Sequence, residues 1–370
     1  MFVTSVGTST PERQYSQREC WEAIEASPCA SRLSRRSRAI LKKVLLGRNG
    51  VSHRYLALDP ISEAFDLTPD ALHARFLTHA PRLATEAATR ALARRGLESL
   101  DIDGLIISTC TGYLCPGLTS YVSERLGLPS CAMLLDLVGQ GCGAALPNLN
   151  AARALLAGGQ CRRVLSVCVE VCSAAFYLDD DPGVLISACL FGDGGGAVVV
   201  EKSPPQDRSS LEWVDYETSL CAEDRDFLRF DHRGGMLRNI LAPEVPEKAA
   251  GHAEAVLDRV LDRAGLSRGE IGQWVTHAGG REVLLAIARR LGLDPELFRQ
   301  SWDVLEECGN LSSPFVLFVL ERAMEVMPPG QWWWLNSFGA GFTSHGALLR
   351  VTNGANGNLE KRSTHAKPKD

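Results

Sequence analysis

The chain has 370 residues, which suits about two domains at the usual ~150 residues each. Its 45% hydrophobic and 22% charged residues are ordinary globular values, and they exclude a chain that is mostly disordered, collagenous or coiled coil. The net charge of -5 argues against a protein whose whole surface binds nucleic acid.

Short apolar runs without polar alternation predict strands that are covered on both faces, and helical periodicity predicts the segments between them. In chain order the patterns predict helix 69–94, strand 105–108, helix 119–126, strand 133–138, helix 148–157, strands 163–169 and 196–200, helix 249–264, strand 274–276, helices 281–291 and 314–327, and strands 332–335 and 347–351. Because strands and helices alternate, we expect an α/β fold with largely parallel sheets.

The segment 203–210, SPPQDRSS, interrupts this pattern and predicts a boundary between two parts of the chain. We therefore expect an N-terminal half at 1–205 and a C-terminal half at 206–352, each with strand–helix–strand units of similar size. Residues 353–370 are polar and rich in Gly and Asn. Their composition predicts a disordered tail.

The chain has no apolar run near the ~18 residues of a membrane span. Its first residues show no basic leader followed by an apolar core, so we expect no secretory signal. The twelve cysteines include no CxxC pair. We expect them to be thiols in a reducing cytoplasm, and no zinc ribbon is indicated.

Cys142 stands between Gly141 and Gly143, where a predicted strand runs into a helix of small residues. The glycines let the backbone adopt unusual dihedral angles and let a ligand approach closely. A helix N-terminus favours the thiolate form of a cysteine. The alternative is a buried structural thiol in a tight turn. The glycines also fit a dinucleotide fingerprint, but the acidic residue expected about 20 positions later is missing, so we set this interpretation aside.

His277 ends a predicted strand in THAGG, and Asn310 precedes a predicted helix in GNLSS. A histidine at the carboxyl end of a strand lies where α/β sheets place ligand chemistry, although alone it is equally typical of a hydrogen-bonded core histidine. Asn310 can cap its helix or donate its amide to a negative oxygen. Cysteine catalysis requires a nucleophile, a base or cationic partner, and a third polar group. Cys142, His277 and Asn310 would supply these in turn.

Five motifs occur in the order GQGCGA, LFGDGGGA, THAGG, GNLSS and SFGAGFTSHGALL. At these motifs the sequence resembles the type III polyketide synthases, the chalcone synthase-like family, over nearly the whole chain except the tail. The resemblance implies a thiolase-like fold, with two duplicated βαβαβ halves in αβαβα layers. It also implies that Cys142 accepts the acyl group, while His277 and Asn310 donate to the thioester oxygen.

The implied activity is an iterative decarboxylative Claisen condensation of malonyl-CoA onto an acyl-CoA starter on Cys142, followed by cyclisation to a pyrone or a resorcinol-type product. The resemblance implies a homodimer. It implies no cofactor, because the coenzyme A thioesters are substrates, and no metal, because loss of the carboxylate generates the carbanion equivalent. The alternative is a ketoacyl synthase III that performs one condensation on a carrier-protein substrate. A hydroxymethylglutaryl-CoA synthase-like enzyme would need Glu170 as an acid–base group, and an inactive scaffold would have lost the Cys, His, Asn set.

The resemblance also implies a gated cavity. Phe191 would be the aromatic gate between a coenzyme A tunnel and the cavity, and Asn239 stands where a second gate is usually phenylalanine. The residues implied to line or approach the cavity are Cys110, Cys115, Cys172, Ala175, Ser187, Phe230 and Ser312. Ala175 is smaller than the threonine of plant members, so we expect room for a longer acyl starter such as a fatty acyl group. Phe230 stands where plant members have glycine, and its larger side chain is expected to reduce the room in the cavity.

The segment 31–54 contains eight basic residues and no acidic one. Cations near a tunnel mouth would pair with the phosphates of coenzyme A. The resemblance points to Lys43 and Arg48 for this role. The alternatives are a solvated helix face with its own salt bridges and a nucleic-acid patch without a supporting motif.

Overall fold

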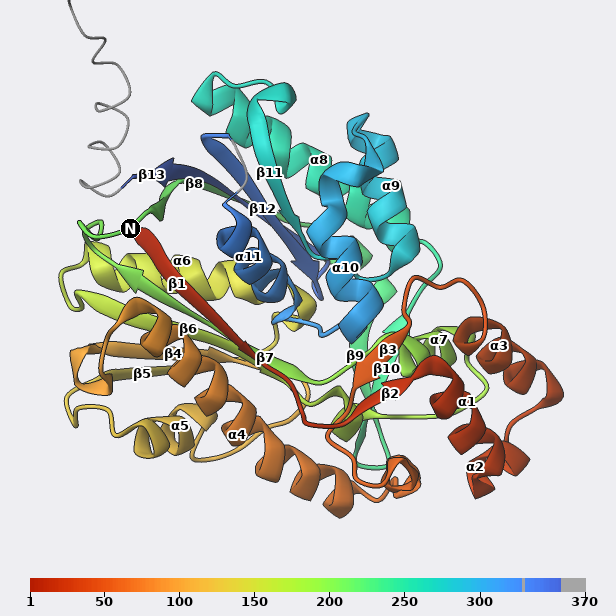
Figure 1. The fold of residues 1–370 in the computed structure, drawn as a ribbon. Helices are drawn as coiled ribbons and strands as arrows, with labels where there is room; N and C mark the ends of the chain where they lie inside the picture. The colour runs from red at the N-terminus through yellow and green to blue at the C-terminus, as the bar shows by residue number, and fades with distance from the viewer. Residues whose placement is uncertain (328–329, 354–370) are drawn as a thin grey trace, which may run out of the picture.

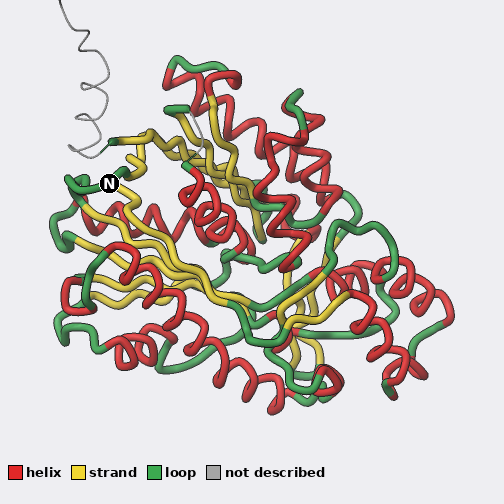
Figure 2. Tube along the Cα trace, in the orientation of Figure 1, coloured by secondary structure: helices red, strands yellow, loops and turns green. Residues whose placement is uncertain are grey.

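The computed structural model describes residues 1–327 and 330–353, and the predicted tail lies almost entirely outside them. A central sheet runs through the molecule (Figures 1 and 2). Its strands are β1 (Phe2–Ser9), β4 (Gly104–Ser108), β5 (Met133–Leu137), β6 (Arg163–Glu170), β7 (Gly194–Glu201), β8 (Ser210–Leu220), β11 (Ile271–Thr276), β12 (Trp332–Gly339) and β13 (Thr343–Thr352). Their order is β11-β12-β13-β8-β1-β7-β6-β4-β5.

The sheet repeats one strand pattern in its two halves. In the first half β1 pairs antiparallel with β7, β7 antiparallel with β6, and β6 parallel with β4. In the second half β8, β13, β12 and β11 repeat these three pairings in the same order. The halves join where Phe2 and Val3 pair with Glu212 and Leu211. This repetition confirms the expected duplication, while the division at residue 205 stays a prediction.

Helices form three layers around the two halves of the sheet. Helices α4 (Pro69–Arg95) and α5 (Leu118–Leu126) cover the outer face of the first half, and α8 (Val245–Ala264) with α9 (Arg281–Leu291) covers that of the second. Helices α6 (Ala145–Ala157) and α11 (Phe315–Val326) lie between the halves and contact strands of both. The result is the αβαβα order that was expected, seen from the side in Figure 1.

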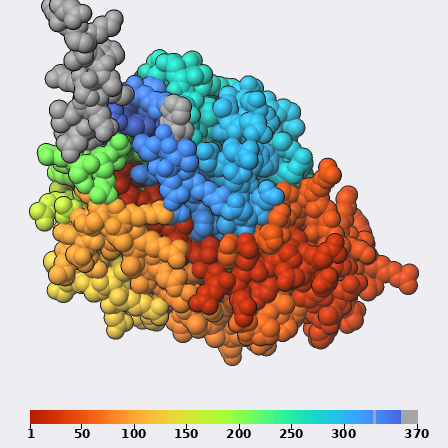
Figure 3. All heavy atoms as spheres, viewed as in Figure 1, coloured from red at the N-terminus to blue at the C-terminus, as the bar shows by residue number. Residues whose placement is uncertain are grey.

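A smaller group of elements lies at one end of the layers, where Figure 1 shows it on the right. Its helices are α1 (Gln17–Ala26), α2 (Pro28–Arg32), α3 (Arg35–Leu45) and α7 (Pro182–Leu190), and its strands form the pairs β2 (Gln14–Ser16) with β3 (His53–Tyr55) and β9 (Leu228–Arg233) with β10 (Met236–Leu241). Helix α10 (Arg299–Cys308) contacts β3 and α11. In Figure 3 the N-terminal segments, red to orange, fill one side and the C-terminal ones, blue, the other.

Every predicted helix and strand is present, with ends that differ by a few residues. The expectation of largely parallel sheets is wrong, because only β4–β5, β4–β6 and β11–β12 are parallel among the described pairs of the central sheet. Part of the error comes from β1 and β8, which were not predicted, and part from the pairs β6–β7 and β12–β13, whose predicted strands are antiparallel. Strand β1 contains small polar residues, and β8 has one half-exposed face, so neither shows a continuous apolar run.

Close packing in the core depends on small side chains. A Cβ atom on Gly7 of β1 would lie 2.4 Å from the backbone nitrogen of Ala91 in α4. Alanines 80, 84, 87, 88 and 91 of α4 are fully buried, which lets this helix approach the sheet. Among the described residues, no helix is both long and apolar enough to cross a membrane.

Candidate active site

Cys142 lies in a tight turn between β5 and α6. The turn is the 3-10 segment η3 (Gly141–Gly143), and Gly141 has a positive φ of 55°. A Cβ atom on Gly339 at the end of β12 would lie 2.5 Å from the backbone nitrogen of Gly143. The turn is thus pressed against the second half of the sheet, and glycine at this contact is what permits the approach. Cys142 itself is 9% exposed.

The turn before α11 contacts Cys142 directly. Ser312 Oγ donates a hydrogen bond to Cys142 Sγ at 3.2 Å. Ser312 has a φ of 60°, a left-handed conformation that non-glycine residues adopt at a cost and that is frequent at functional sites. Its backbone nitrogen donates to Asn310 Oδ1 at 2.8 Å, so the asparagine side chain fixes the turn.

The same asparagine reaches the loop after β11. Asn310 Nδ2 donates to the carbonyl oxygen of Gly279 at 2.8 Å, and Gly279 follows His277 by two residues. An amide nitrogen carries two hydrogens, so the second one remains available to a ligand oxygen. One side chain therefore connects the loop of His277 with the turn of Ser312, which contacts Cys142.

His277 is buried at the end of β11. Its ring lies edge-on between Phe315, 5.2 Å away, and Phe338, 5.0 Å away. Phe338 directly precedes Gly339, the residue pressed against the Cys142 turn, so a second series of contacts connects the two sites. The backbone nitrogen of His277 donates to the carbonyl oxygen of Asn336 at 2.9 Å, while Nδ1 has no hydrogen-bond partner among the described residues.

Burial favours the neutral forms of both Cys142 and His277. It lowers the pKa of His277 to about 3 and raises the pKa of Cys142 to about 12, with the Ser312 hydrogen bond opposing the latter shift. The expected preference for thiolate at a helix N-terminus is therefore opposed by desolvation. If His277 is the proton acceptor, as we expect, the imidazolium would offset the buried negative charge of the thiolate.

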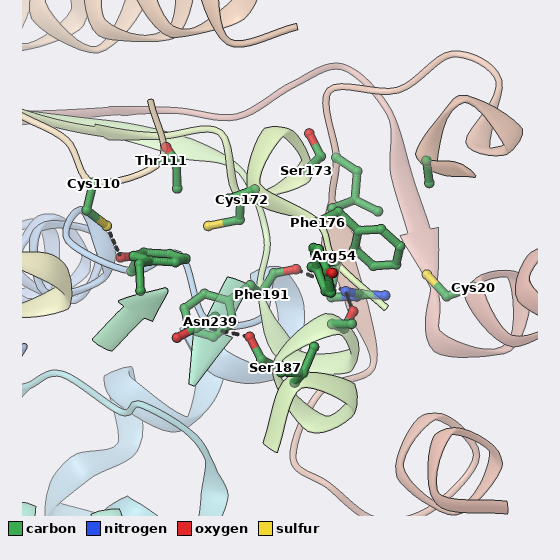
Figure 4. Close-up of a pocket in the computed structure, with 18 of the residues that line it drawn as sticks. Cys20, Arg54, Cys110, Thr111, Cys172, Ser173, Phe176, Ser187, Phe191 and Asn239 are labelled. Atoms are coloured by element: carbon green, nitrogen blue, oxygen red, sulfur yellow. Dashed lines mark hydrogen bonds between the residues drawn. The ribbon is translucent and has the colours of Figure 1, made fainter. Parts of the chain in front are cut away.

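A cavity opens beside Cys142. Its empty space, with the open mouth included, is about 1030 Å³. The predicted residues that line it with Cys142 are Cys110, Cys172, Ala175, Ser187, Phe191, Phe230, Asn239 and Ser312. Figure 4 shows it extending from Cys110 at one end to Cys20 at the other. His277 and Asn310 do not line this wall, and Cys115 is exposed on a loop outside it.

The predicted gate is built from polar as well as aromatic groups. Asn239 on β10 donates from Nδ2 to Ser187 Oγ on α7 at 2.8 Å, as Figure 4 shows. Phe191 follows α7, and its carbonyl oxygen accepts a hydrogen bond from Arg54 Nη1 at 3.0 Å. Arg54 also donates to the carbonyl oxygen of Ala188 at 2.7 Å and is only 4% exposed. Arg54 therefore holds the backbone at Ala188 and Phe191 and does not belong to the basic surface.

The far end of the cavity was missed by the sequence analysis. Its wall is apolar and comes from α1, from the segment after β3 and from the 3-10 helix η1 (Ile61–Phe65), with Cys20, Ala23, Ile24, Leu56, Leu58, Ile61, Ala64 and Phe65. A signal for α1 was present, because Ser16 and Glu19 form a capping box before an amphipathic segment. Nothing in the sequence indicated that this segment faces the cavity.

Glu170 lies at the end of β6, fully buried next to the site. Its carboxylate accepts hydrogen bonds from Ser313 Oγ at 2.6 Å, Thr111 Oγ1 at 2.9 Å and the backbone nitrogen of Cys110 at 3.0 Å. Burial raises its pKa and these donors oppose the shift. The carboxylate ties the Cys110 loop to the Ser312 turn, and it does not line the cavity.

The basic segment forms an exposed surface on and around α3. Lys43 and Arg48 are exposed, and neither makes an ion pair within residues 1–327 and 330–353. The same holds for Arg32, Arg35, Arg36, Arg38 and Lys42. The described residues therefore do not neutralise this basic surface by salt bridges. Its cations remain available to an anionic ligand.

Comparison with known proteins gives consistent matches. Residues 3–204 match the model for the N-terminal domain of chalcone and stilbene synthases, and residues 231–352 match that for the C-terminal domain. The chain is 31% identical to the 3,5-dihydroxyphenylacetyl-CoA synthase of Streptomyces toyocaensis, over 94% of this chain and 89% of the relative. It is 28% identical to the alpha-pyrone synthesis polyketide synthase-like protein of Mycobacterium tuberculosis, over 87% and 83%.

Among solved structures, the chain is similar to the polyketide synthase PKS-I of the brown alga Ectocarpus siliculosus. The TM-score is 0.86 at 25% identity, with 95% of this chain and 98% of that chain covered. The match extends over both halves of the sheet and includes the end group that carries the cavity.

We expect His277 to accept the proton of Cys142, and alkylation of the thiol measures this. In His277→Gln the thiol has no proton acceptor, so the rate of Cys142 modification by iodoacetamide at pH 7 should fall by at least ~10-fold. The rate should then keep rising up to pH 10, as expected for a pKa near 12. Peptide mass spectrometry follows the modification, and exposed Cys131 serves as the internal control. Equal rates in both proteins would exclude this role of His277.

Proposed function

The chain belongs to the chalcone and stilbene synthase family and is a type III polyketide synthase, an acyltransferase; we propose that Cys142 is its nucleophile and that His277 and Asn310 are its oxygen-binding donors. The observation that carries this proposal is the hydrogen-bonded connection from Cys142 through Ser312 and Asn310 to the His277 loop. It brings three distant segments to one buried point beside the cavity.

The first step is transfer of the starter. Cys142 Sγ attacks the carbonyl carbon of the acyl-CoA, after its proton passes to His277, and coenzyme A leaves as the thiol with a proton returned from the imidazolium. The oxygen of the tetrahedral intermediate carries negative charge and needs hydrogen-bond donors. The His277 imidazole and the second N–H of the Asn310 amide supply them.

The second step is extension. Malonyl-CoA loses its carboxylate as carbon dioxide, and the electron pair of the broken C–C bond becomes an enolate on the remaining acetyl thioester. The enolate carbon attacks the acyl group on Cys142, and Cys142 leaves as the thiolate. A neutral amide at Asn310 stabilises the enolate, whereas a carboxylate would repel it. Repetition lengthens the chain until it cyclises to a phenolic or pyrone product, the product types in the names of the relatives.

The apolar far end of the cavity supports a long starter. Ile24, Leu56 and Ile61 offer hydrocarbon surface there, and a fatty acyl chain gains about 0.8 kcal/mol for each methylene that it buries. Ala175 lies in the wall of the same cavity as these residues and Cys142. We therefore propose an acyl-CoA with a long alkyl chain as the starter.

The exposed cations of α3 support the binding of coenzyme A. Its phosphates carry negative charge, and Lys43 and Arg48 lie on the free basic surface at the end of the molecule that contains the cavity. Guanidinium and ammonium groups bind phosphate by charge-assisted hydrogen bonds. These two residues are the proposed contacts.

The edge of the sheet supports a homodimer. Strand β5 is the last strand of the first half, and Leu134, Leu135 and nearby Val138 are exposed along it. An apolar strand edge favours pairing with another chain. The loop of Cys115 carries the exposed Tyr113, which extends the same apolar surface.

The twelve free cysteines support a reducing compartment such as the cytoplasm.

The proposed activity is tested with purified protein, malonyl-CoA and a panel of acyl-CoA starters from short to long. Mass spectrometry should find pyrones or phenolic rings with several acetate units, and Cys142→Ala should form none because it cannot hold the acyl chain. A single two-carbon extension that requires a carrier-protein substrate would instead indicate a ketoacyl synthase III. Absence of any product and of acylated Cys142 would contradict the proposal.

The starter length is tested with Ala175→Thr. The larger side chain adds a methyl and a hydroxyl group and narrows the cavity, so the ratio of kcat/KM for long over short starters should fall by at least ~10-fold, the lower end of the effect of one methylene in an apolar pocket. Ala74→Thr places the same substitution on an exposed position of α4 and should leave the ratio unchanged. An undiminished preference for long starters in Ala175→Thr would rule out this role.

A further inference from the structure

A second cluster of reactive side chains lies outside the cavity, at the end of β8. Cys221 directly follows this strand, Asp224 lies in the 3-10 helix η5 (Ala222–Phe227), and His252 lies in α8. One potential ligand atom from each of them lies within 4.8 Å of the others. None of the three lines the cavity, and the catalytic steps use none of them.

The three side chains are a typical donor set for a transition metal. A thiolate, an imidazole nitrogen and a carboxylate oxygen bind Zn²⁺ at about 2.0–2.3 Å in a tetrahedral arrangement. Ligand atoms that are already within 4.8 Å of one another need only a small inward movement to reach this geometry. Hard cations such as Mg²⁺ and Ca²⁺ prefer oxygen ligands, so the thiol favours zinc and its neighbours.

Additional hydrogen bonds orient two of the three ligands. Asp224 Oδ2 faces His252 Nε2 at 3.2 Å, while its other oxygen, Oδ1, accepts from Lys248 Nζ at 2.9 Å. His252 Nδ1 faces Ser219 Oγ at 3.4 Å, a long contact that still directs the ring. In metal sites the ligand atom that does not bind the ion is commonly held in this way, which fixes the histidine tautomer and the carboxylate rotamer.

The backbone that carries the cluster is well held. Cys221 and Phe342 exchange two backbone hydrogen bonds of 2.9 and 3.0 Å, and the His252 ring stacks on Phe342 with centroids 5.5 Å apart. The His252 side chain is 19% exposed and Cys221 is half-buried. An ion can therefore enter from solvent, and a water molecule can occupy the fourth position.

We propose that Cys221, Asp224 and His252 bind a divalent transition-metal ion, with Zn²⁺ as the natural occupant and water as the fourth ligand. On binding, the Cys221 thiol loses one proton to solvent and the thiolate binds the metal. The contacts of Asp224 with Lys248 and His252 account for the carboxylate and the imidazole, whereas a metal ion would engage the Cys221 thiol as well. The ion would fasten η5 and α8 to the end of β8.

Cobalt tests this proposal, because tetrahedral Co²⁺ absorbs in the visible range and a cobalt–thiolate bond adds a charge-transfer band in the near ultraviolet. The full-length protein, stripped with a chelator, should bind one equivalent of Co²⁺ with both features, and Zn²⁺ should displace it. Cys221→Ser should lose the charge-transfer band, and His252→Gln should weaken binding at least ~10-fold. Cys142→Ala and Cys131→Ser, which change a buried and an exposed thiol elsewhere, should keep both bands.

Two results would overturn the proposal: no tetrahedral spectrum in the stripped protein, or a thiolate band that persists in Cys221→Ser and disappears in Cys142→Ala. Thermal unfolding without metal shows whether each variant is folded, and His252→Gln provides an independent answer if Cys221→Ser is not. Product formation by Cys221→Ser is measured in parallel. It separates the metal site from the proposed polyketide synthesis, because the two share no residue.

Discussion

The side-chain amide of Asn310 is the contact on which the active site depends. Its nitrogen bonds the loop after His277, and its oxygen bonds the turn that places Ser312 against Cys142. These segments come from both halves of the chain, and α6 and α11 carry their turns to the space between the halves. Without this amide, the direct hydrogen-bonded link between the His277 loop and the Ser312 turn would be lost. Donor positions must be accurate to a fraction of an ångström.

Burial decides the chemistry of the site. Cys142 and His277 are both removed from water, which opposes a charge on either group. The proposed proton transfer between them would create two charges that offset each other, so the proposed reactive state is an ion pair. The same exclusion of water strengthens every donor that faces a developing enolate or oxyanion. Exclusion of water thus shapes both the apolar cavity and the chemistry proposed for Cys142 and His277.

The sequence predicted those parts of the structure that leave a local pattern. Cys142, His277 and Asn310 stand in short motifs at strand–helix junctions, and Asn239 was placed on the cavity by counting from a nearby motif. Residues whose role depends on distant contacts were not found. Arg54 appeared to belong to a basic surface, although it is buried and positions Phe191. Strands β1 and β8, and the apolar wall from α1, likewise required tertiary contacts to be recognised.

The most direct test of this account is the decarboxylation of malonyl-CoA without a starter, compared between the wild type and Asn310→Asp. The carboxylate has nearly the same shape, but it offers no N–H donor and repels the enolate. Release of carbon dioxide should fall by about 10²–10³, the usual effect of removing one oxyanion donor, while the variant remains folded and iodoacetamide still modifies Cys142. Unchanged decarboxylation in Asn310→Asp would contradict the account.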